Sequence, residues 1–200
     1  MPHWIIHPLI LENDNVKLVP LEEQHFNELI AIGQDKRIWE FMPVDWLGQK
    51  DLKQVLQDAL IARESGQQYP FVAIDKATNK IFGSTRYLRI NKDFKNLEIG
   101  WTWYSPDYWG TSYNKDCKYL LLQYCFETLG TISVNFGTSD TNLRSRKAIE
   151  NIGAKYEGTV RNRLVWDNVK RNFAIYSIID DEWPEVKNKL KTALKKRGNS

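Results

Sequence analysis

Two places where a predicted strand leads into a predicted helix constrain this chain most. The first strand is LEIGWTWYSP at residues 97–106, in which apolar residues alternate with polar or small ones, as expected with one buried face. From Tyr113 onward, apolar residues recur at the three- and four-residue spacing of an amphipathic helix. A helix N-terminus exposes unpaired backbone N–H groups and partial positive charge. The loop at 108–114 can therefore bind a pyrophosphate without a basic side chain.

The second junction begins at Thr141, after the predicted strand at 133–138. Asp140, Thr141 and Asn142 offer capping side chains before a helix predicted over 143–152. Asn142 stands at the helix entrance, where its amide can pair with amide groups of a cofactor arm. Ser145 lies about one turn further in, where its hydroxyl can reach a sulfur at the end of that arm. Simple helix capping is the alternative for both residues. Together the two junctions predict an acyltransferase that uses a phosphorylated, thiol-bearing cofactor.

The second junction also supports a family resemblance. The segment NLRSRKAIENIGAKYEG at residues 142–158 resembles the Asn-x-x-Ser element, helix, Gly-Ala and Glu-Gly strand start of GNAT superfamily N-acetyltransferases. Within that superfamily, the chain resembles the RimJ/RimL branch of protein N-terminal acetyltransferases. The resemblance covers nearly the whole chain, from LENDNVKLVPLEEQHFNEL at 11–29 to KRNFAIYSII at 170–179. It implies acetyl-CoA as the acyl donor.

The phosphate loop departs from the superfamily pattern. In that pattern, Gln or Arg is followed after two residues by Gly, and after one more residue by Gly or Ala. This chain has Trp109 at the Gln or Arg position, Ser112 at the Gly position and Asn114 at the Gly or Ala position. Ser112 and Asn114 add β-carbons, but every backbone N–H donor is retained because none of these residues is proline. Trp109 either stacks on the cofactor or packs the loop onto the helix. The resemblance implies cofactor contacts from this loop at Trp109, Gly110, Thr111, Ser112, Tyr113 and Asn114.

The resemblance implies a mixed α/β fold with a central mixed, mostly antiparallel sheet flanked by helices. The sequence pattern predicts strands at 16–18, 69–75, 80–90, 97–104, 133–138, 156–166 and 171–179, and helices at 22–33, 49–64, 113–129 and 143–152. Residues 1–184 are expected to form a single GNAT domain. Residues 185–200, with six basic residues against one acidic residue, are expected to form a basic helical tail.

Transfer of an acetyl group to an amine requires a base, an acid and a donor to the oxyanion. Glu98 is the candidate base, directly or through a water, and Ser145 is the candidate acid, as the resemblance implies. The backbone N–H of Trp103 or Tyr104 is predicted to polarise the thioester carbonyl. Many GNAT enzymes use a tyrosine as the acid where this chain has Ile149, so the Tyr104 hydroxyl is an alternative acid. The alternative for Glu98 is a solvent-facing strand carboxylate.

Acceptor recognition is predicted for the aromatic segment before the sheet. Trp39, Phe41, Met42 and Trp46 are dense apolar residues around a proline, which suits a loop folded over a pocket. Padding of the core is the alternative. The resemblance places this region on the acceptor side. A peptide N-terminus and a small-molecule primary amine both remain open as the acceptor.

Other features predict where such a protein works. No run of about 18 apolar residues occurs, and the start lacks the basic region of a signal peptide, so a cytoplasmic protein without membrane contact is expected. Cys117 and Cys125 lie eight residues apart on one predicted helix, which is too far for a disulfide and predicts reduced thiols. The three histidines lack partners at ligand spacing, so no metal is expected.

Two rival functions remain open. One is a catalytically silent acyl-CoA-binding module, suggested by the altered phosphate loop. The other is an RNA- or ribosome-associated protein whose basic tail makes the contact, although a solvated charged helix is the simpler interpretation of the tail. The predicted partners are acetyl-CoA and an amine acceptor, with the chain as a monomer or homodimer.

Overall fold

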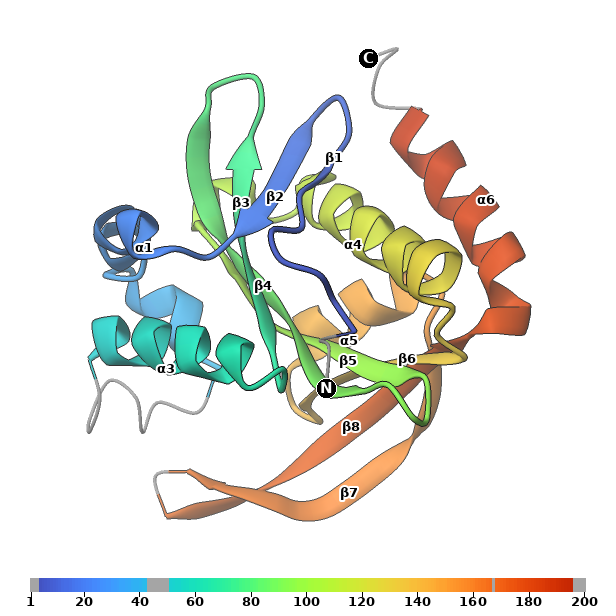
Figure 1. The fold of residues 1–200 in the computed structure, drawn as a ribbon. Coiled ribbons are helices and arrows are strands. Elements are labelled where there is room, and N and C mark those ends of the chain that lie inside the picture. Colours follow the sequence, from blue (N-terminus) through green and yellow to red (C-terminus); the bar gives the residue numbers. More distant parts are fainter. Residues whose placement is uncertain (1–3, 43–50, 167, 196–200) are drawn as a thin grey trace.

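The fold is one mixed sheet with helices on both faces. A computed structural model describes residues 4–42, 51–166 and 168–195 (Figure 1). The strands lie in the order β1-β2-β3-β4-β5-β6-β8-β7, and all neighbours are antiparallel except the parallel pair β5 and β6. The predicted fold class is confirmed. The strands are β1 (Leu11–Glu12), β2 (Val16–Pro20), β3 (Tyr69–Asp75), β4 (Lys80–Asn91), β5 (Asn96–Tyr104), β6 (Ser133–Ser139), β7 (Lys155–Trp166) and β8 (Val169–Ile179).

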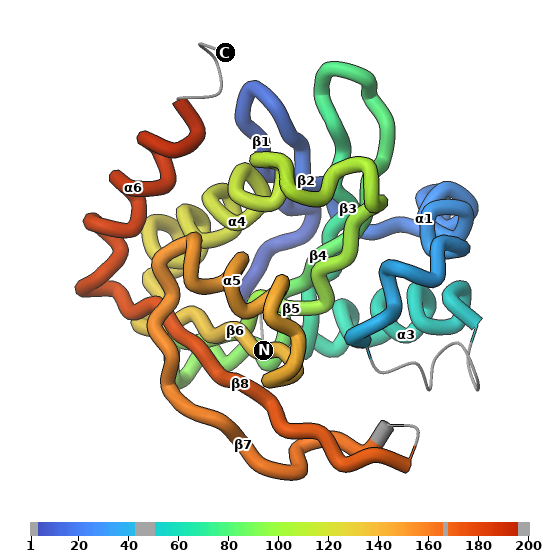
Figure 2. The backbone as a smooth tube through the Cα atoms, turned by 180° about the vertical axis from the view of Figure 1, so that it is seen from behind, coloured from blue at the N-terminus to red at the C-terminus, as the bar shows by residue number. Residues whose placement is uncertain are grey.

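The helices divide between the two faces of the sheet. Helices α1 (Phe26–Ile32) and α3 (Leu52–Glu64) cover one face, and α4 (Tyr113–Tyr124), α5 (Leu143–Asn151) and α6 (Trp183–Lys195) cover the other (Figures 1 and 2). The parallel pairing of β5 with β6 requires a crossover, and α4 provides it. Both junctions identified from the sequence therefore follow neighbouring strands of one parallel pair.

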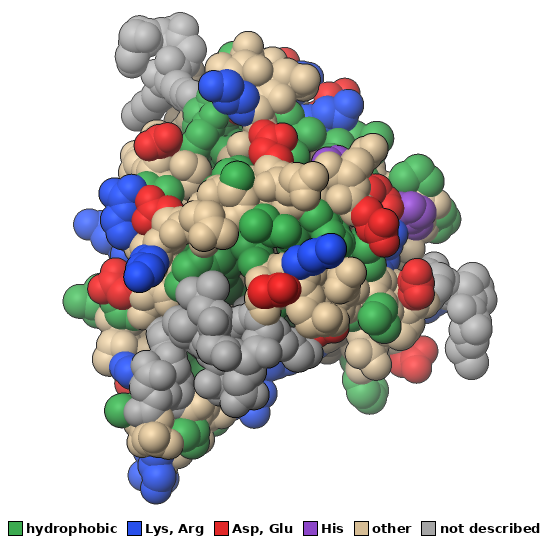
Figure 3. Space-filling view, turned by 90° about the vertical axis from the view of Figure 1, so that its left-hand side faces the viewer, with side chains coloured by type: hydrophobic (Ala, Val, Ile, Leu, Met, Phe, Trp, Pro, Cys, Tyr) green, Lys and Arg blue, Asp and Glu red, His purple; other side chains and the backbone are tan. Residues whose placement is uncertain are grey.

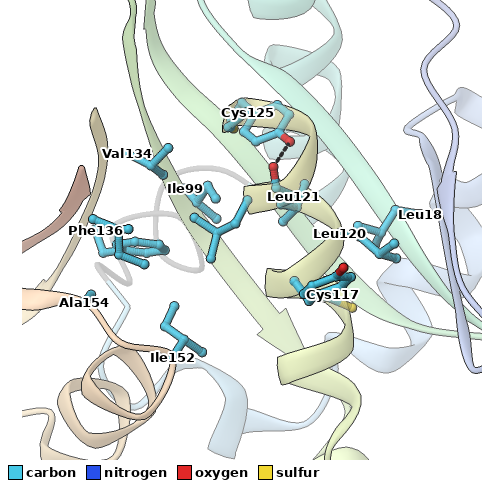
Figure 4. Packing of buried hydrophobic residues seen from close by; sticks show 14 of the residues in the cluster. Leu18, Ile99, Cys117, Leu120, Leu121, Cys125, Val134, Phe136, Ile152 and Ala154 are labelled. Carbon is cyan, nitrogen blue, oxygen red and sulfur yellow. Dashed lines mark hydrogen bonds between the residues drawn. The ribbon is translucent and has the colours of Figure 1, made fainter. Parts of the chain in front are cut away.

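The core consists of two clusters, one on each face. In the larger cluster, Ile99 and Phe136 from the sheet meet Leu121 of α4 (Figure 4). The hydroxyl of Tyr87 donates to the carbonyl oxygen of Leu121 at 2.8 Å, which attaches α4 to β4. In the smaller cluster, Trp103 packs against residues from α1 and α3. Apolar side chains of β5 therefore contribute to the clusters on both faces of the sheet.

A β-bulge in β5 changes which side chains reach each face. Gly100 pairs with Arg86, but Trp103 pairs with Ser84, so β5 has one extra residue here. Trp101 has a φ of +52°, which is uncommon for a residue with a side chain. Because of the extra residue, Ile99 and Trp103 lie on opposite faces although both have odd numbers. The simple alternation predicted from the sequence therefore fails beyond Gly100.

Several element boundaries differ from the prediction. The helix predicted over 22–33 begins as a 3₁₀ turn at Glu23–His25 and becomes α-helical only at Phe26. The helix predicted over 113–129 changes to a π-helical turn at Cys125–Leu129, where the N–H of Thr131 donates to the carbonyl oxygen of Cys125. The short strand β1 was not predicted from the sequence. Part of the predicted acceptor segment, residues 43–50, lies outside the described residues.

Helix α6 holds its apolar side against the larger cluster. Trp183, Val186 and Leu190 are buried, and the indole N–H of Trp183 donates to Oε1 of Glu127 at 2.8 Å. Lys187 forms an ion pair with the same carboxylate at 2.5 Å. The helix thus begins at Trp183, and its charged side chains face outward or pair with Glu127. Across the described part of the chain, no helix is long and apolar enough to cross a membrane.

Candidate active site

The site forms where β5 and β6 separate. Their parallel pairing covers only Asn96 to Glu98 on β5 and Ser133 to Asn135 on β6. Beyond these residues β5 continues to Tyr104 and β6 continues to Ser139 without pairing to each other. Each strand then leads to a helix, α4 and α5 respectively. The opening between the strands therefore lies below two helix N-termini, with Glu98 at its base.

The loop before α4 presents backbone donors. Gly110 has a φ of +72°, a conformation that glycine adopts readily. The N–H groups of Gly110, Thr111 and Asn114 donate to no group in the described part of the chain. The loop is held by aromatic packing, since the Tyr108 ring stacks on Phe82 with centroids 4.6 Å apart. This arrangement of amide donors at a helix N-terminus suits a phosphate group.

Ser112 and Asn114, which depart from the phosphate-loop pattern, do not cover the backbone amide donors before α4. Ser112 and Asn114 are half-buried, and the Ser112 hydroxyl lies 3.4 Å from Oδ2 of Asp116. Asp116 is fully buried and accepts from the amides of Asn13 at 2.8 Å and Asn15 at 3.2 Å. It attaches the first turn of α4 to the turn before β2, a role that sequence reasoning missed. Its charge is stabilised by the helix N-terminus.

At the second junction, Asn142 caps α5. Its Oδ1 accepts from the backbone N–H of Ser145 at 3.0 Å, so the capping alternative holds for this oxygen. The Ser145 side chain is half-buried, and its hydroxyl pairs with no group among the described residues. Arg146 donates from Nε to the Tyr176 hydroxyl at 2.8 Å and from Nη1 to the carbonyl oxygen of Asp140. Arg146 therefore anchors α5 to β8.

Trp109 joins the two junctions. The guanidinium of Arg144, in the first turn of α5, lies over the Trp109 ring at 3.9 Å from its centroid. The indole N–H of Trp109 donates to the carbonyl oxygen of Tyr104 at 3.0 Å. The ring also packs against both core clusters, which favours the packing role for Trp109. Residues that the sequence placed at separate junctions thus meet in one place.

Glu98 is buried at the base of the opening. It is 9% exposed, so the interpretation as a solvent-facing carboxylate is wrong. Burial raises the pKa of Glu98, whereas the positive charges of Arg89 and Arg163 lower it. Nη1 of Arg89 donates to Oε2 of Glu98 at 2.8 Å. A carboxylate whose pKa is raised by burial is a stronger base than an exposed one.

The geometry distinguishes between the two backbone donors predicted near the end of β5. Trp103 pairs with Ser84, and its carbonyl oxygen faces Gly83, so its polar backbone atoms point toward β4. Tyr104 is the next residue, and its carbonyl oxygen faces the Trp109 indole instead. Because N–H and C=O of one strand residue point to the same side, the Tyr104 N–H faces away from β4. That direction is toward the opening.

The Tyr104 side chain points into the core. Its ring lies 5.1 Å from that of Phe82, and its buried hydroxyl has no hydrogen-bond partner among the described residues. Burial raises the pKa of Tyr104 well above its usual value. The burial of this hydroxyl in the core disfavours Tyr104 as the acid that protonates a thiolate in the opening.

A buried lysine beside the bulge was missed by sequence reasoning. Nζ of Lys118, on α4, donates to Oγ1 of Thr102 at 2.6 Å and lies 3.4 Å from Oγ1 of Thr85. Burial lowers the pKa of Lys118 to about 8. The indication in the sequence was its place next to Cys117 on the apolar side of the helix.

The predicted acceptor residues have different environments. Trp39 is buried, with its indole N–H donating to the Gly33 carbonyl oxygen at 2.8 Å and its ring 5.4 Å from Trp103, which favours core packing. Phe41 and Met42 are half-buried. Trp46 lies outside the described residues. Figure 3 looks onto this side, and apolar side chains gather in a band across its middle.

No group of three His, Cys, Asp or Glu side chains that could hold a metal ion occurs among the described residues. The observed features are a splayed parallel strand pair, amide donors at a helix N-terminus and a buried carboxylate beside them. Together they define a protein that binds a phosphorylated cofactor and transfers an acyl group.

Comparison with known proteins identifies the family. The profile described as acetyltransferase (GNAT) domain matches residues 15–155, and the chain belongs to this family. It is therefore an acetyl-CoA-dependent N-acetyltransferase. Comparison with curated protein sequences gives no significant match.

Three solved structures illustrate the similarity of the fold. A GCN5-related N-acetyltransferase from Brucella melitensis is 26% identical with a TM-score of 0.82, covering 94% of this chain and 86% of that one. Mycobacterium smegmatis RimJ, in complex with CoA-disulfide, is 18% identical with a TM-score of 0.79, covering 94% and 95%. Ribosomal-protein-S5-alanine acetyltransferase from Vibrio fischeri is 17% identical with a TM-score of 0.71, covering 88% and 98%.

Proposed function

We propose that this chain transfers the acetyl group of acetyl-CoA to a primary amine by direct attack in a ternary complex. The amine belongs to a protein N-terminus or to a small molecule, and the chain belongs to the RimJ/RimL-like branch. The observation that supports this most is the buried Glu98 at the base of the β5–β6 opening. The structural neighbour that is a ribosomal-protein-S5-alanine acetyltransferase favours a protein acceptor.

In this mechanism Glu98 acts as the general base. An acceptor amine is protonated near neutral pH and must lose a proton before its lone pair attacks the thioester carbon. The carboxylate of Glu98 accepts that proton, directly or through one water. Arg89 must release Oε2 or leave Oε1 to do so, since only Oε2 accepts from Arg89. The new N–C bond then places negative charge on the former carbonyl oxygen.

The backbone stabilises that charge, and Ser145 completes the reaction. The Tyr104 N–H, which faces away from β4, is the proposed donor to the oxyanion. When the intermediate collapses, the C–S bond breaks and the CoA thiolate accepts a proton. The Ser145 hydroxyl, which has no partner among the described residues, is the proposed source of that proton. The attacking nitrogen of the intermediate still carries one proton too many, and the loss of this proton as the amide forms restores the Ser145 hydroxyl. Ile149 offers no competing hydroxyl where many GNAT enzymes have tyrosine.

Acetyl-CoA is proposed to lie between the two junctions. Its pyrophosphate would accept from the loop amides that include Gly110, Thr111 and Asn114. Its arm would then run into the opening toward Ser145, past Asn142. Asn142 Oδ1 is used in the helix cap, so a contact to the arm would come from its N–H₂ group. The buried free thiols Cys117 and Cys125 agree with a cytoplasmic compartment.

Two substitutions test the proposal. Thiol release from acetyl-CoA, measured with an acceptor amine, should fall in Glu98→Gln and in Ser145→Ala, while acetyl-CoA binding is retained. Turnover that survives in both variants would refute this mechanism. Acetyl-CoA binding without turnover in the unaltered chain would favour the silent binding module.

A further inference from the structure

Arg86 is a buried cation with an unused hydrogen-bonding edge. It lies on β4, is 3% exposed, and donates from Nη1 to Oε1 of Gln68 at 3.3 Å. Nε and Nη2 are buried and have no hydrogen-bond partner within the described part of the chain. These two N–H groups form the planar fork that binds a carboxylate through two parallel bonds. Buried donors without a partner cost free energy, so they need an explanation.

The described residues around Arg86 supply no such partner. The Trp101 ring lies 4.7 Å from the guanidinium carbon and covers the flat face of the group, which leaves the edge. Burial lowers the pKa of Arg86 to about 10, and the charge of Asp58 on α3 opposes this. Neither Nε nor Nη2 reaches the Asp58 carboxylate. Among the described residues, the neutral amide of Gln68 is the sole hydrogen-bond acceptor of this guanidinium.

Arg86 and Glu98 lie on the same face of neighbouring strands. Arg86 pairs with Gly100, and a side chain on Gly100 would meet Oε1 of Glu98 at 3.3 Å. The two side chains are therefore diagonal neighbours, whose Cα atoms are separated by roughly 7–8 Å. Both alternate along their strands with Tyr87 and Ile99 of the larger cluster, so they lie on the opposite side of the sheet, which α1 and α3 cover.

Positive charge dominates around Glu98. Arg89 bonds to it at 2.8 Å, and Arg163 of the β7–β8 hairpin is close enough to lower its pKa. Arg86, on the neighbouring strand, adds a third positive charge to the same face of the sheet. An acceptor that is only cationic would be repelled here, since like charges at these distances are unfavourable. An acceptor that also has an anionic group would be attracted.

We propose that the acceptor carries a carboxylate beside its primary amine, and that the Nε–Nη2 fork of Arg86 binds this carboxylate while the amine faces Glu98. The inference rests on the proposed function and names its acceptor class. The carboxylate belongs either to a free α-amino acid or to an acidic side chain at the N-terminus of a peptide. The fork is shielded from solvent, so the carboxylate displaces a covering side chain, and half-buried Trp101 is the described one in contact.

Matched acceptor pairs test the proposal on the unaltered chain. Alanine is compared with alaninamide, and Asp-Ala-amide with Asn-Ala-amide, by amine-dependent thiol release from acetyl-CoA. In at least one pair the carboxylate member should have a kcat/KM roughly tenfold to a hundredfold higher, the range for a hydrogen bond to a charged group. The pair that shows the preference identifies the source of the carboxylate. Equal kcat/KM values within both pairs would overturn the proposal.

Variants connect the preference to Arg86. Arg86→Gln should abolish the preference, and Arg86→Lys should retain part of it. Lys189→Gln on α6 should keep the preference in full, because Lys189 forms its ion pair with Glu185 on its own helix. A preference that persists in a folded Arg86→Gln variant would overturn the assignment.

Calorimetry makes the test independent of turnover and of the folding of the variants. Two product pairs are compared, N-acetylalanine with N-acetylalaninamide and N-acetyl-Asp-Ala-amide with N-acetyl-Asn-Ala-amide. In at least one pair the carboxylate member should bind the unaltered chain more tightly, and equal affinities within both pairs would contradict the carboxylate site. Absence of thiol release with every amine would instead refute the proposed function, and the calorimetric comparison would still decide on the site.

Discussion

Replacement of Lys118 by methionine is predicted to stabilise this protein at neutral pH. The ammonium group is buried beneath the β5 bulge, and its hydrogen bonds go to the hydroxyls of Thr102 and Thr85. Methionine has a similar length and no charge to desolvate. The two hydroxyls lie 2.7 Å apart and remain paired with each other after the substitution, so no buried polar group loses its last partner.

The size of the effect follows from the pKa of Lys118. Burial lowers it from 10.5 to about 8, and each tenfold change in proton affinity corresponds to about 1.4 kcal/mol. Below pH 8 the lysine is charged in both the folded and the unfolded chain, so the full cost of about 3 kcal/mol applies. Between pH 8 and 10.5 the unfolded chain binds more protons, and the free energy of unfolding rises with pH. The advantage of methionine should therefore shrink across this range.

Urea unfolding followed by tryptophan fluorescence checks this prediction. At pH 7 the free energy of unfolding of Lys118→Met should exceed that of the unaltered chain by about 3 kcal/mol, and the difference should be smaller at pH 9.5. Lys147→Met, on the exposed side of α5, serves as a control and should show no such pH dependence. A variant that is less stable at pH 7, or a difference that is equal at both pH values, would refute the reasoning.

Three further predictions concern the site. Glu98→Gln should lower kcat by roughly 10²–10⁴-fold in steady-state assays and remove the acidic limb of the pH profile, and a smaller loss would argue against a general base. Burial raises the pKa of Glu98 above 4.5, whereas the positive charge of Arg89 lowers it, so kcat/KM should rise with pH through the pKa of Glu98. Arg89→Gln removes that charge and should move the rise to higher pH. A rise that stays at the same pH in Arg89→Gln would contradict the interaction between Arg89 and Glu98. Gly83→Ala should destabilise the fold by about 2 kcal/mol or more in thermal unfolding. The added β-carbon would overlap the backbone of Trp103 and lie 2.8 Å from Cα of Tyr104. Unchanged stability would count against this close approach of the two strands.

Much of the fold could be predicted because it depends on local patterns. The spacing of apolar residues located seven strands and four helices, and the family resemblance supplied the sheet type. The boundaries that failed depend on tertiary contacts. The π-helical turn at Cys125–Leu129 packs against α6, because the Trp183 ring stacks on Phe126 and its indole N–H donates to Glu127. The bulge at Trp101 is likewise visible only once β4 and β5 are paired.

The candidate site was predicted in its position but not in its environment. Local motifs located Asn142, Ser145 and Glu98, yet the burial of Glu98 depends on which strands surround it. The contact between Arg144 and Trp109 joins segments about 35 residues apart in sequence, which no local pattern predicts. Arg86 and Lys118 have charged side chains that composition alone assigns to the surface.

Amine-dependent release of free thiol from acetyl-CoA tests the central claim most directly. The assay should offer the unaltered chain N-terminal peptides, free amino acids, polyamines and aminoglycosides, with acetyl-CoA binding measured by calorimetry in parallel. The account predicts that acetyl-CoA binds and that thiol release requires an amine and matches the acetylated product in amount. Binding of acetyl-CoA without amine-dependent thiol release from any of these acceptors would contradict it.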